Sequence, residues 1–285
     1  MRVQWKEKAM RCVFGAAACA CILAVLLICF FLFANGLPFF EQVPVLDFLS
    51  GEVWRPSSGQ FGILPMILGS VYVTAGALIL GAPLGILTAV YLARFCSKRM
   101  YAVLKPAISL LAGIPSVVYG FFGLTVIVPA VRETLGGFGS SMLAASLLLA
   151  LMILPTVVLQ AEAALQAVPE NYYEGSLALG ATREASVFRT VLPAAKSGLL
   201  AAVILALGRA VGETMAVMMV AGNQARMPSG LLSGIRTLTV NIVMEMGYAT
   251  DLHRQALMAT GVALFVFILL INLLFSALKQ KGVKP

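Results

Sequence analysis

The chain has 285 residues, of which 60% are hydrophobic and only 11% are charged, and its formal net charge is +8. A soluble domain carries about 25% charged residues, so this composition excludes an ordinary soluble protein and indicates a membrane protein. Five cysteines without a CxxC pair and a single histidine, His253, argue against a metal, redox or proton-relay site, and no cofactor is expected.

Six apolar runs are long enough to cross a bilayer, for which a helix needs about 20 residues. They lie at about residues 12–34, 64–93, 107–130, 141–161, 196–222 and 256–278. The first run is too long for the core of a signal peptide and lacks a convincing cleavage site, so we expect a retained signal-anchor helix. The sequence therefore predicts an all-α membrane protein with six transmembrane helices. We divide it into residues 1–63, with the tail, first helix and first outside loop, and a five-helix core over residues 64–285.

The basic residues predict the orientation of the chain. With the N-terminus inside, the inside segments hold most of them: Arg2, Lys6, Lys8, Arg11, Arg94, Lys98, Arg99, Lys105, Arg183, Arg189, Lys196, Lys279, Lys281 and Lys284. The outside segments hold only Arg55, Arg132, Arg226, Arg236 and Arg254. This distribution follows the positive-inside rule, so both termini are expected in the cytoplasm. Because membrane orientation accounts for the basic residues, no separate basic patch exists, and we expect no nucleic-acid partner.

The first outside loop, residues 35–63, is long and contains Glu41, Asp47, Glu52 and Trp54. It can contact an extracytoplasmic partner or serve as an ordinary connector, and the sequence leaves both open.

The second and third spans contain residues that perturb helices. In the second, Gly81–Gly85 reads GAPLG, with two glycines that favour close helix packing and a proline that can kink the helix. The third contains a broken, glycine-rich stretch, with Gly113, Pro115, Gly120 and Gly123. Irregular backbone at membrane depth is tolerated only where protein or a water-filled path covers it.

The fourth span is expected to end at Pro155–Gln160, with Glu162 at the membrane interface. A polar loop follows, and residues 170–193 predict two short helices. Pro169 suits the start of the first helix, and Gly180 can end it in the left-handed conformation. Thr182 can cap the second helix, and Pro193 is expected to end the two-helix loop. Such a shaped loop is a candidate docking surface; the alternative is an amphipathic loop lying on the lipid.

This loop resembles the EAA loop of bacterial ABC-importer permeases, whose pattern is E-A-A, three residues, G, nine residues, I-x-L-P. The chain departs from the pattern at Gly175, Ser176 and Thr190, where the pattern has Ala, Ala and Ile. The resemblance implies the type I importer permease (MetI-like) fold, in which this loop is a cytoplasmic coupling helix that inserts into a groove on a separate ATPase subunit. The residues expected to contact the ATPase are Glu174, Gly180, Ala181, Thr182, Leu192 and Pro193.

The fifth span, Ala201–Asn223, has Arg209 and Glu213 near its middle. Charges at this depth are rare, because a central Arg costs at least about 2.5–3.5 kcal/mol to insert. In a continuous helix their i,i+4 spacing places both on one face, where they can neutralise each other at rest. Gly208 and Gly212 beside them permit close approach by another helix or by a solute.

An oxyanion that crosses a low-dielectric region needs fixed positive charge and hydrogen-bond donors. A guanidinium supplies both, and a neighbouring carboxylate weakens its field enough for transient binding. Arg209 and Glu213, with the Thr214 hydroxyl nearby, therefore form a candidate translocation site for an anion. The alternative is a structural ion pair that fixes the register of the helices.

The stretch Gly208–Asn223, GRAVGETMAVMMVAGN, closely resembles the PstC-type permeases of phosphate-specific ABC importers, and Ile114–Gly120 resembles their corresponding region. The resemblance covers essentially the whole six-span portion, and it implies roles in phosphate translocation for Arg209 and Glu213. It also implies a PstA-like permease, a PstB-like ATPase dimer and a PstS-like phosphate-binding protein as partners in the bacterial inner membrane. The chain has no G-x-x-x-x-G-K-[ST] loop, so we expect ATP hydrolysis on another subunit and no enzymatic activity here.

Two other functions stay open: an ABC permease for another oxyanion, such as sulfate or molybdate, and a secondary carrier that works alone. Such carriers often contain internal repeats, which are not evident here. The last outside loop contains Arg236–Met246, whose apolar residues predict a short helix that either gates the outer mouth or merely packs.

Overall fold

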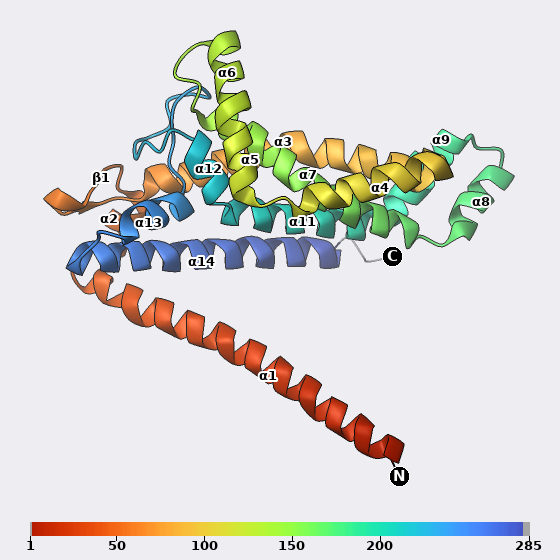
Figure 1. Cartoon of the computed structure of the whole chain (residues 1–285), viewed down its shortest axis with the longest axis horizontal. Helices are drawn as coiled ribbons and strands as arrows, with labels where there is room; N and C mark the ends of the chain where they lie inside the picture. Colours follow the sequence, from red (N-terminus) through yellow and green to blue (C-terminus); the bar gives the residue numbers. More distant parts are fainter. Residues whose placement is uncertain (1, 282–285) are drawn as a thin grey trace.

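The computed structural model describes residues 2–281, and within that range the chain is almost entirely helical. Four long helices run side by side along the molecule: α3 (Leu64–Val90), α7 (Met142–Gln166), α11 (Lys196–Gly212) and α14 (Asp251–Lys281) (Figure 1). The most extensive interface joins α3 to α7, and their contact forms the centre of the core. The predicted all-α membrane fold is confirmed.

Five helical segments of the described chain are long and apolar enough to cross a membrane, and a bent pair supplies a sixth. The five are Ala9–Glu41, Leu64–Phe95, Ser116–Leu135, Met142–Gln166 and Asp251–Leu274. The bent pair joins Arg183–Ala194 to Lys196–Gly212 at an angle of 69°. The predicted apolar runs therefore correspond to these segments, except that the third and fifth are not single helices.

The third predicted span is interrupted, as its glycines and proline predicted, but its boundaries are wrong. Instead of one helix over residues 107–130, α4 (Lys98–Gly113) runs alongside α7, and the chain then turns at Pro115. It continues across the bundle through α5 (Ser116–Phe122) and α6 (Val128–Leu135) (Figure 1). The Tyr119 hydroxyl donates a hydrogen bond to the carbonyl of Leu111 at 2.9 Å, which bridges the interruption.

The first helix, α1 (Arg2–Gly36), packs against the described part of the chain towards its C-terminal end. There Phe33 packs edge-on against Phe265 of α14 with ring centroids 5.8 Å apart. Its other end diverges from α14, and its apolar side chains are exposed over most of its length (Figure 1). An α-helix that is apolar all round suits a lipid surface or a helix of another subunit.

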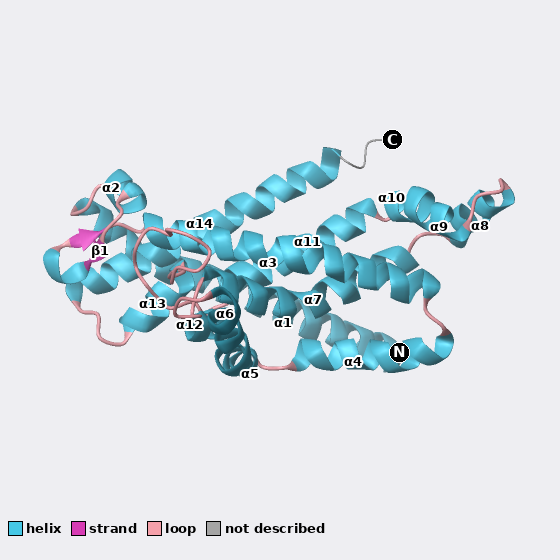
Figure 2. Cartoon of the chain, turned by 90° about the horizontal axis from the view of Figure 1, so that it is seen from above, coloured by secondary structure: helices cyan, strands magenta, loops and turns pink. Residues whose placement is uncertain are grey.

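The two ends of the molecule differ in structure (Figure 2). At one, which we call the loop end, the chain forms α8 (Glu170–Ala178), α9 (Arg183–Ser186) and α10 (Leu192–Ala194). At the other, the cap end, lie α2 (Val45–Ser50), α13 (Leu238–Met246) and the paired strands β1 (Trp54–Arg55) and β2 (Gln60–Phe61). The start of α1 and the end of α14 both point towards the loop end (Figures 1 and 2).

Residues 37–63, which we call the cap, form a small folded unit around aromatic side chains. Phe39 and Phe48 are fully buried, with ring centroids 5.0 Å apart, and Phe61 packs edge-on against both Phe39 and Trp54. Such pairs contribute about 0.5–1.5 kcal/mol each beyond the area they bury. The long loop of the sequence is therefore an ordered piece that rests on α3 and α14.

The GAPLG stretch of α3 packs closely on α7, as predicted. A side-chain carbon at Gly85 would lie 2.7 Å from Val157, and one at Gly81 would lie 3.0 Å from the carbonyl of Ala150. Because no larger residue fits at Gly85 without displacing α7, these glycines explain the extensive α3–α7 contact.

Candidate functional site

The fifth span is broken at the charged residues that the sequence singled out. The helix α11 ends at Gly212, and Glu213 is extended, with φ −71° and ψ 127°. A second short helix, α12 (Met215–Val220), follows the break. The prediction that Arg209 and Glu213 share one face of a continuous helix is therefore wrong.

Side chains at the break explain why the helix stops there. A carboxylate oxygen of Glu213 accepts the backbone N–H of Ala216 at 3.1 Å, which caps α12, and the Thr214 hydroxyl donates to the carbonyl of Gly212 at 3.3 Å. Such local bonds between side chains and backbone compete with the helical hydrogen bonds. Glu213 thus holds the break open, a role that its spacing from Arg209 did not reveal.

Arg209 is half-buried near the end of α11 and does not pair with Glu213. Its guanidinium donates a hydrogen bond to the Thr156 hydroxyl of α7 at 3.2 Å. The ion pairs of the described residues are Arg94–Glu170, Lys105–Glu162, Arg236–Glu245 and His253–Glu245. The expected neutralisation at rest is therefore wrong: the positive charge of Arg209 is held by a neutral hydroxyl and stays available to an anion.

One side of α11 next to Arg209 is open. An added side-chain carbon at Gly208 or Gly212 would meet nothing within 4 Å beyond its chain neighbours and its own helical backbone, and Leu205, one turn before Gly208, is exposed. The guanidinium thus lies beside a surface that nothing in the described part of this chain covers, where another helix or a solute can approach.

The two interrupted spans pack against each other. A side-chain carbon at Gly120 in α5 would lie 2.6 Å from the sulfur of Met219 and 3.0 Å from the Cα of Ala216 in α12. Gly123 approaches Val220 equally closely. The glycines of the third span therefore allow α12 to approach, and protein covers Gly120 and Gly123, as irregular backbone at membrane depth requires. The two breaks themselves, at Gly113 and Gly212, are exposed in the described chain.

The short helix predicted over Arg236–Met246 is confirmed as α13, and its N-terminal end holds the break in place. The Thr239 hydroxyl donates to the carbonyl of Glu213 at 3.2 Å. The backbone N–H of Leu238 donates to the Ser70 hydroxyl of α3 at 2.9 Å.

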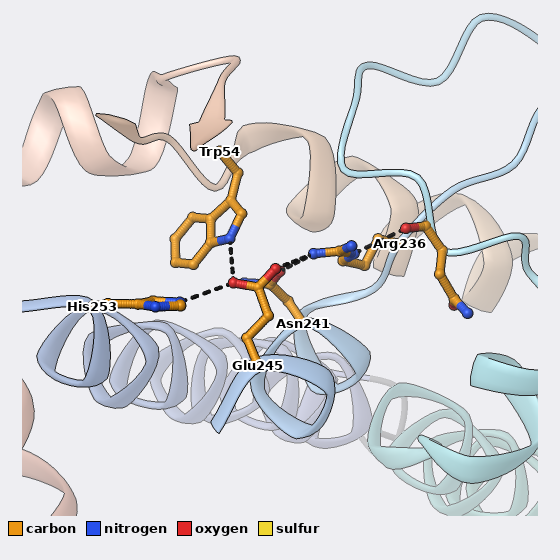
Figure 3. A network of polar contacts seen from close by, with 6 residues as sticks. Trp54, Arg236, Asn241, Glu245 and His253 are labelled. Carbon is orange, nitrogen blue, oxygen red and sulfur yellow. Dashed lines mark hydrogen bonds and ion pairs between the residues drawn. The ribbon is translucent and has the colours of Figure 1, made fainter. Parts of the chain in front are cut away.

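At its other end α13 joins a buried polar network (Figure 3). The carboxylate of Glu245 accepts hydrogen bonds from the indole of Trp54 at 2.8 Å and from Arg236, and it pairs with His253 at 2.9 Å. Arg236 also donates to the side-chain oxygen of Asn241 at 3.0 Å. Trp54 and Glu245 are 191 residues apart, so no local pattern could have predicted the network. It locks the cap onto α13 and α14.

The loop end has the two-helix form that the sequence predicted. Gly180 has φ +84°, and the N–H groups of Gly180 and Ala181 bond the carbonyls of Leu177 and Ser176, the pattern of a Schellman helix terminus. Thr182 caps the second helix by accepting the N–H of Ala185 at 3.2 Å. Pro193 does not close the piece, because the helix continues through it to Ala194 before the 69° bend.

The coupling residues suggested by the family resemblance are mostly exposed. Glu174, Gly180, Thr182 and Pro193 are exposed, whereas Ala181 and Leu192 are partly covered. The exposed Arg183 guanidinium donates a hydrogen bond to the Tyr173 hydroxyl at 3.4 Å, which links α9 to α8.

Two departures from the EAA pattern lie next to each other in space. Thr190 replaces the Ile of the pattern and Ser176 replaces its second Ala, and their hydroxyl oxygens are 3.4 Å apart. A hydroxyl pair thus stands where the pattern has two apolar side chains. This contact links α8 to the segment that follows α9.

The fourth span does not end at Pro155–Gln160 as predicted, because α7 continues to Gln166. Glu162 lies in the last turns of this helix. Its side chain is fully buried and pairs with Lys105 of α4, while Tyr101 and Gln166 donate further hydrogen bonds at 2.7 and 3.0 Å. The sequence could not place this carboxylate, because its cationic partner lies 57 residues away.

Comparison with known proteins identifies the family of this chain. Residues 81–281 match the family described as binding-protein-dependent transport system inner membrane component. The chain is 39% identical to the probable ABC transporter permease protein YqgH of Bacillus subtilis, over 97% of this chain and 93% of the relative. It is 35% identical to the phosphate transport system permease protein PstC of Mesorhizobium japonicum, over 79% and 75%.

Solved structures share the fold. A bacterial ABC transporter involved in the import of alginate has a chain that superposes with a TM-score of 0.64 at 16% identity, over 94% of this chain and 96% of that one. At such identity the likeness shows the MetI-like fold of type I importer permeases and nothing about the solute. The chain therefore belongs to the family of binding-protein-dependent transport system inner membrane components and is a permease subunit of an ABC importer.

Proposed function

We propose that this chain is the PstC-type permease subunit of an importer for inorganic phosphate. The observation that carries the proposal is the Arg209 guanidinium, which lies at the break of a spanning helix beside an open surface and is held there by a hydroxyl. The relatives named PstC support phosphate as the solute.

The chemistry of the break suits a transient phosphate site. The planar, permanently charged guanidinium can donate two parallel hydrogen bonds to phosphate oxygens, and the Thr214 hydroxyl lies at the same break. Glu213 has two roles in this proposal. It caps α12 and keeps its negative charge near the path, which weakens phosphate binding enough for release.

In this proposal a second permease subunit covers the open side of α11. A PstA-like permease would cover Gly208 and Gly212 and complete the path between the two permeases. A PstS-like binding protein would deliver phosphate at the cap end, which then faces outwards, and both termini would lie in the cytoplasm with the loop end. The positive-inside distribution of Lys and Arg supports this orientation.

The loop end would transmit the action of the ATPases. In this proposal α8 and α9 dock on a PstB-like ATPase dimer, on which ATP is hydrolysed. Closure of the dimer would push the loop and, through the 69° bend, the base of α11. The path would then switch from inward-facing to outward-facing. Glu174, Gly180, Ala181, Thr182, Leu192 and Pro193 would form or shape the contact.

The test of the function is reconstitution of the complex that copurifies with this chain from its native membranes. We expect ATP-dependent uptake of radiolabelled phosphate into proteoliposomes that is not reduced by a tenfold excess of sulfate or molybdate. Competition by either anion would assign the site to another oxyanion. Uptake that persists after removal of the ATPase subunit would identify a secondary carrier and reject the proposal.

The left-handed turn gives a sharp test of coupling. Gly180→Ala forces a side chain into φ +84°, which destabilises the turn by about 1 kcal/mol or more and changes the angle between α8 and α9. We expect ATP-driven uptake to fall several-fold while ATP hydrolysis by the complex continues. The measurement is the ratio of phosphate transported to ATP hydrolysed.

Gly175→Ala is the matched control for this change. Gly175 lies inside α8, a side-chain carbon there meets nothing within 4 Å, and the EAA pattern itself has Ala at this position. We expect the control to transport normally. Equal transport ratios for Gly180→Ala and Gly175→Ala would contradict a role for the turn.

A further inference from the structure

The helix α13 is hydrogen-bonded both to the cap and to the break in the fifth span. Its N-terminal end reaches the Glu213 carbonyl through Thr239, and its C-terminal end reaches Trp54 through Glu245. The sequence left open whether this segment is a gate or only a packing element, and the proposed function assigns no role to it.

The hydrogen bonds at the N-terminal end of α13 form a chain in which each hydroxyl donates towards the Glu213 carbonyl. The N–H of Val240 donates to the hydroxyl oxygen of Thr237, which caps α13. The hydroxyl oxygens of Thr237 and Thr239 are 3.1 Å apart. Because the Thr239 hydroxyl has a single proton and gives it to the Glu213 carbonyl, Thr237 must be the donor in this contact.

The carbonyl of Glu213 depends on this contact. The peptide around it is extended, so the carbonyl lies outside the helical ladders of α11 and α12, and the Thr239 hydroxyl is its hydrogen-bond partner in the described chain. Thr239 itself is buried. Without the Thr239 hydroxyl this part-buried carbonyl would lose its partner, so the break would shift towards a geometry that satisfies the carbonyl elsewhere.

The opposite end of α13 is fixed to the cap. Glu245 and Trp54 are both buried, and the indole N–H donates to the carboxylate at 2.8 Å. Glu245 also binds Arg236, whose side chain donates to the carbonyl of Asn223, just after α12 (Figure 3). The cap is thus linked through Glu245 to α13, which ends in contact with the break at Thr239.

We propose that Thr239 is a positioning residue for translocation, which sets the geometry of the Glu213 break, and that α13 transmits movements of the cap to it. The inference rests on the proposed function in that the break is taken as part of the solute path. Its consequence is that docking of a binding protein at the cap end reorients the backbone next to Arg209. The partner on the outside would thus act on the path without touching it.

The first variant is Thr239→Val, which removes the hydroxyl and keeps the volume. We expect the maximal rate of uptake at saturating binding protein to fall about tenfold, the effect of one lost hydrogen bond, with little change in the half-saturating phosphate concentration. Thr239→Ser restores the donor and should restore the rate. The ATPase rate stimulated by binding protein is measured in parallel and should fall with it, so the result does not depend on which anion is carried.

Thr260→Val is the matched control. Thr260 is fully buried, and its hydroxyl donates to the carbonyl of Ala256 within α14 and not to the break. Equal losses in Thr239→Val and Thr260→Val, or a Thr239→Ser variant that stays inactive, would show a merely structural effect and overturn the proposal. An unchanged rate of uptake in Thr239→Val would also overturn the proposal.

The second variant, Trp54→Phe, tests transmission through α13. It removes the indole donor but leaves Arg236 and His253 on Glu245, so the network persists. We expect a loss of about threefold in the same rates, because the cap then moves partly independently of α13. If the two ends act in series, the double variant is no slower than Thr239→Val alone. Losses that multiply would show independent sites and overturn the proposed transmission.

Discussion

Uptake of phosphate is expected to fall at least about 100-fold when Arg209 is replaced by alanine, because the variant loses two charge-assisted hydrogen bonds of about 1.5–3 kcal/mol each to the anion. The residue lies at the broken end of α11 and contacts Thr156. The measurement is ATP-dependent uptake by the reconstituted complex over a range of phosphate concentrations.

Failure to insert in the membrane does not explain such a loss. Removing a charge from the middle of a span makes insertion easier by about 2.5–3.5 kcal/mol, so the variant should reach the membrane at least as well as the wild type. Arg209→Lys keeps the charge but loses the planar fork, and we expect intermediate uptake with weaker half-saturation.

Arg132→Ala is the control for a change of the same type elsewhere. Arg132 lies exposed on α6 and forms no ion pair with the described residues. It should transport at the normal rate. Normal uptake by an inserted Arg209→Ala complex would instead leave the guanidinium with a purely structural role, and the proposed path would have to be abandoned.

The second large effect is expected on stability. Lys105→Ala leaves the carboxylate of Glu162 without its cation although this side chain is 0% exposed. Breaking a buried ion pair costs about 3–5 kcal/mol, and the partial exposure of Lys105 points to the lower end, about 3 kcal/mol. The temperature at which the detergent-solubilised complex loses its monodisperse peak should therefore fall by several degrees.

A double variant separates loss of the pair from loss of packing. In Lys105→Met with Glu162→Gln both charges are gone, and the amide can still bond Tyr101 and Gln166. Replacing a buried ion pair by neutral groups of similar size is often close to neutral, so most of the stability should return. Lys98→Ala, at the exposed start of the same helix, should have no measurable effect. A Lys105→Ala complex as stable as Lys98→Ala would contradict this account.

The spans and the loop end could be predicted because the information is local. A bilayer requires long apolar helices, and the Schellman turn at Gly180 and the cap at Thr182 depend on residues within one turn. The family resemblance added the role of that loop. The predicted end of this loop at Pro193 was nevertheless wrong, because the helix continues through Pro193 to Ala194.

The contacts of the charged residues could not be predicted, because their partners lie far away in the sequence. The i,i+4 spacing of Arg209 and Glu213 assumed a helix that in fact ends at Gly212, where Glu213 caps the next helix and Thr239 fixes its carbonyl. Glu162 and Glu245 meet partners up to 191 residues away. Such contacts depend on tertiary packing, which hydropathy and spacing do not encode.

The bend between α10 and α11 determines the direction in which the bundle can respond to force. The two helical segments meet at 69°, so a thrust along the first is delivered mostly sideways to the second. At the foot of α11 the backbone of Gly198 lies against Ala164, where an added carbon would be only 2.5 Å from its methyl group. That close contact leaves no room for the foot of α11 to slide towards α7. A sideways thrust there would instead have to tilt the helix, and a tilt about its foot would displace Gly212, at the other end of the helix, the most.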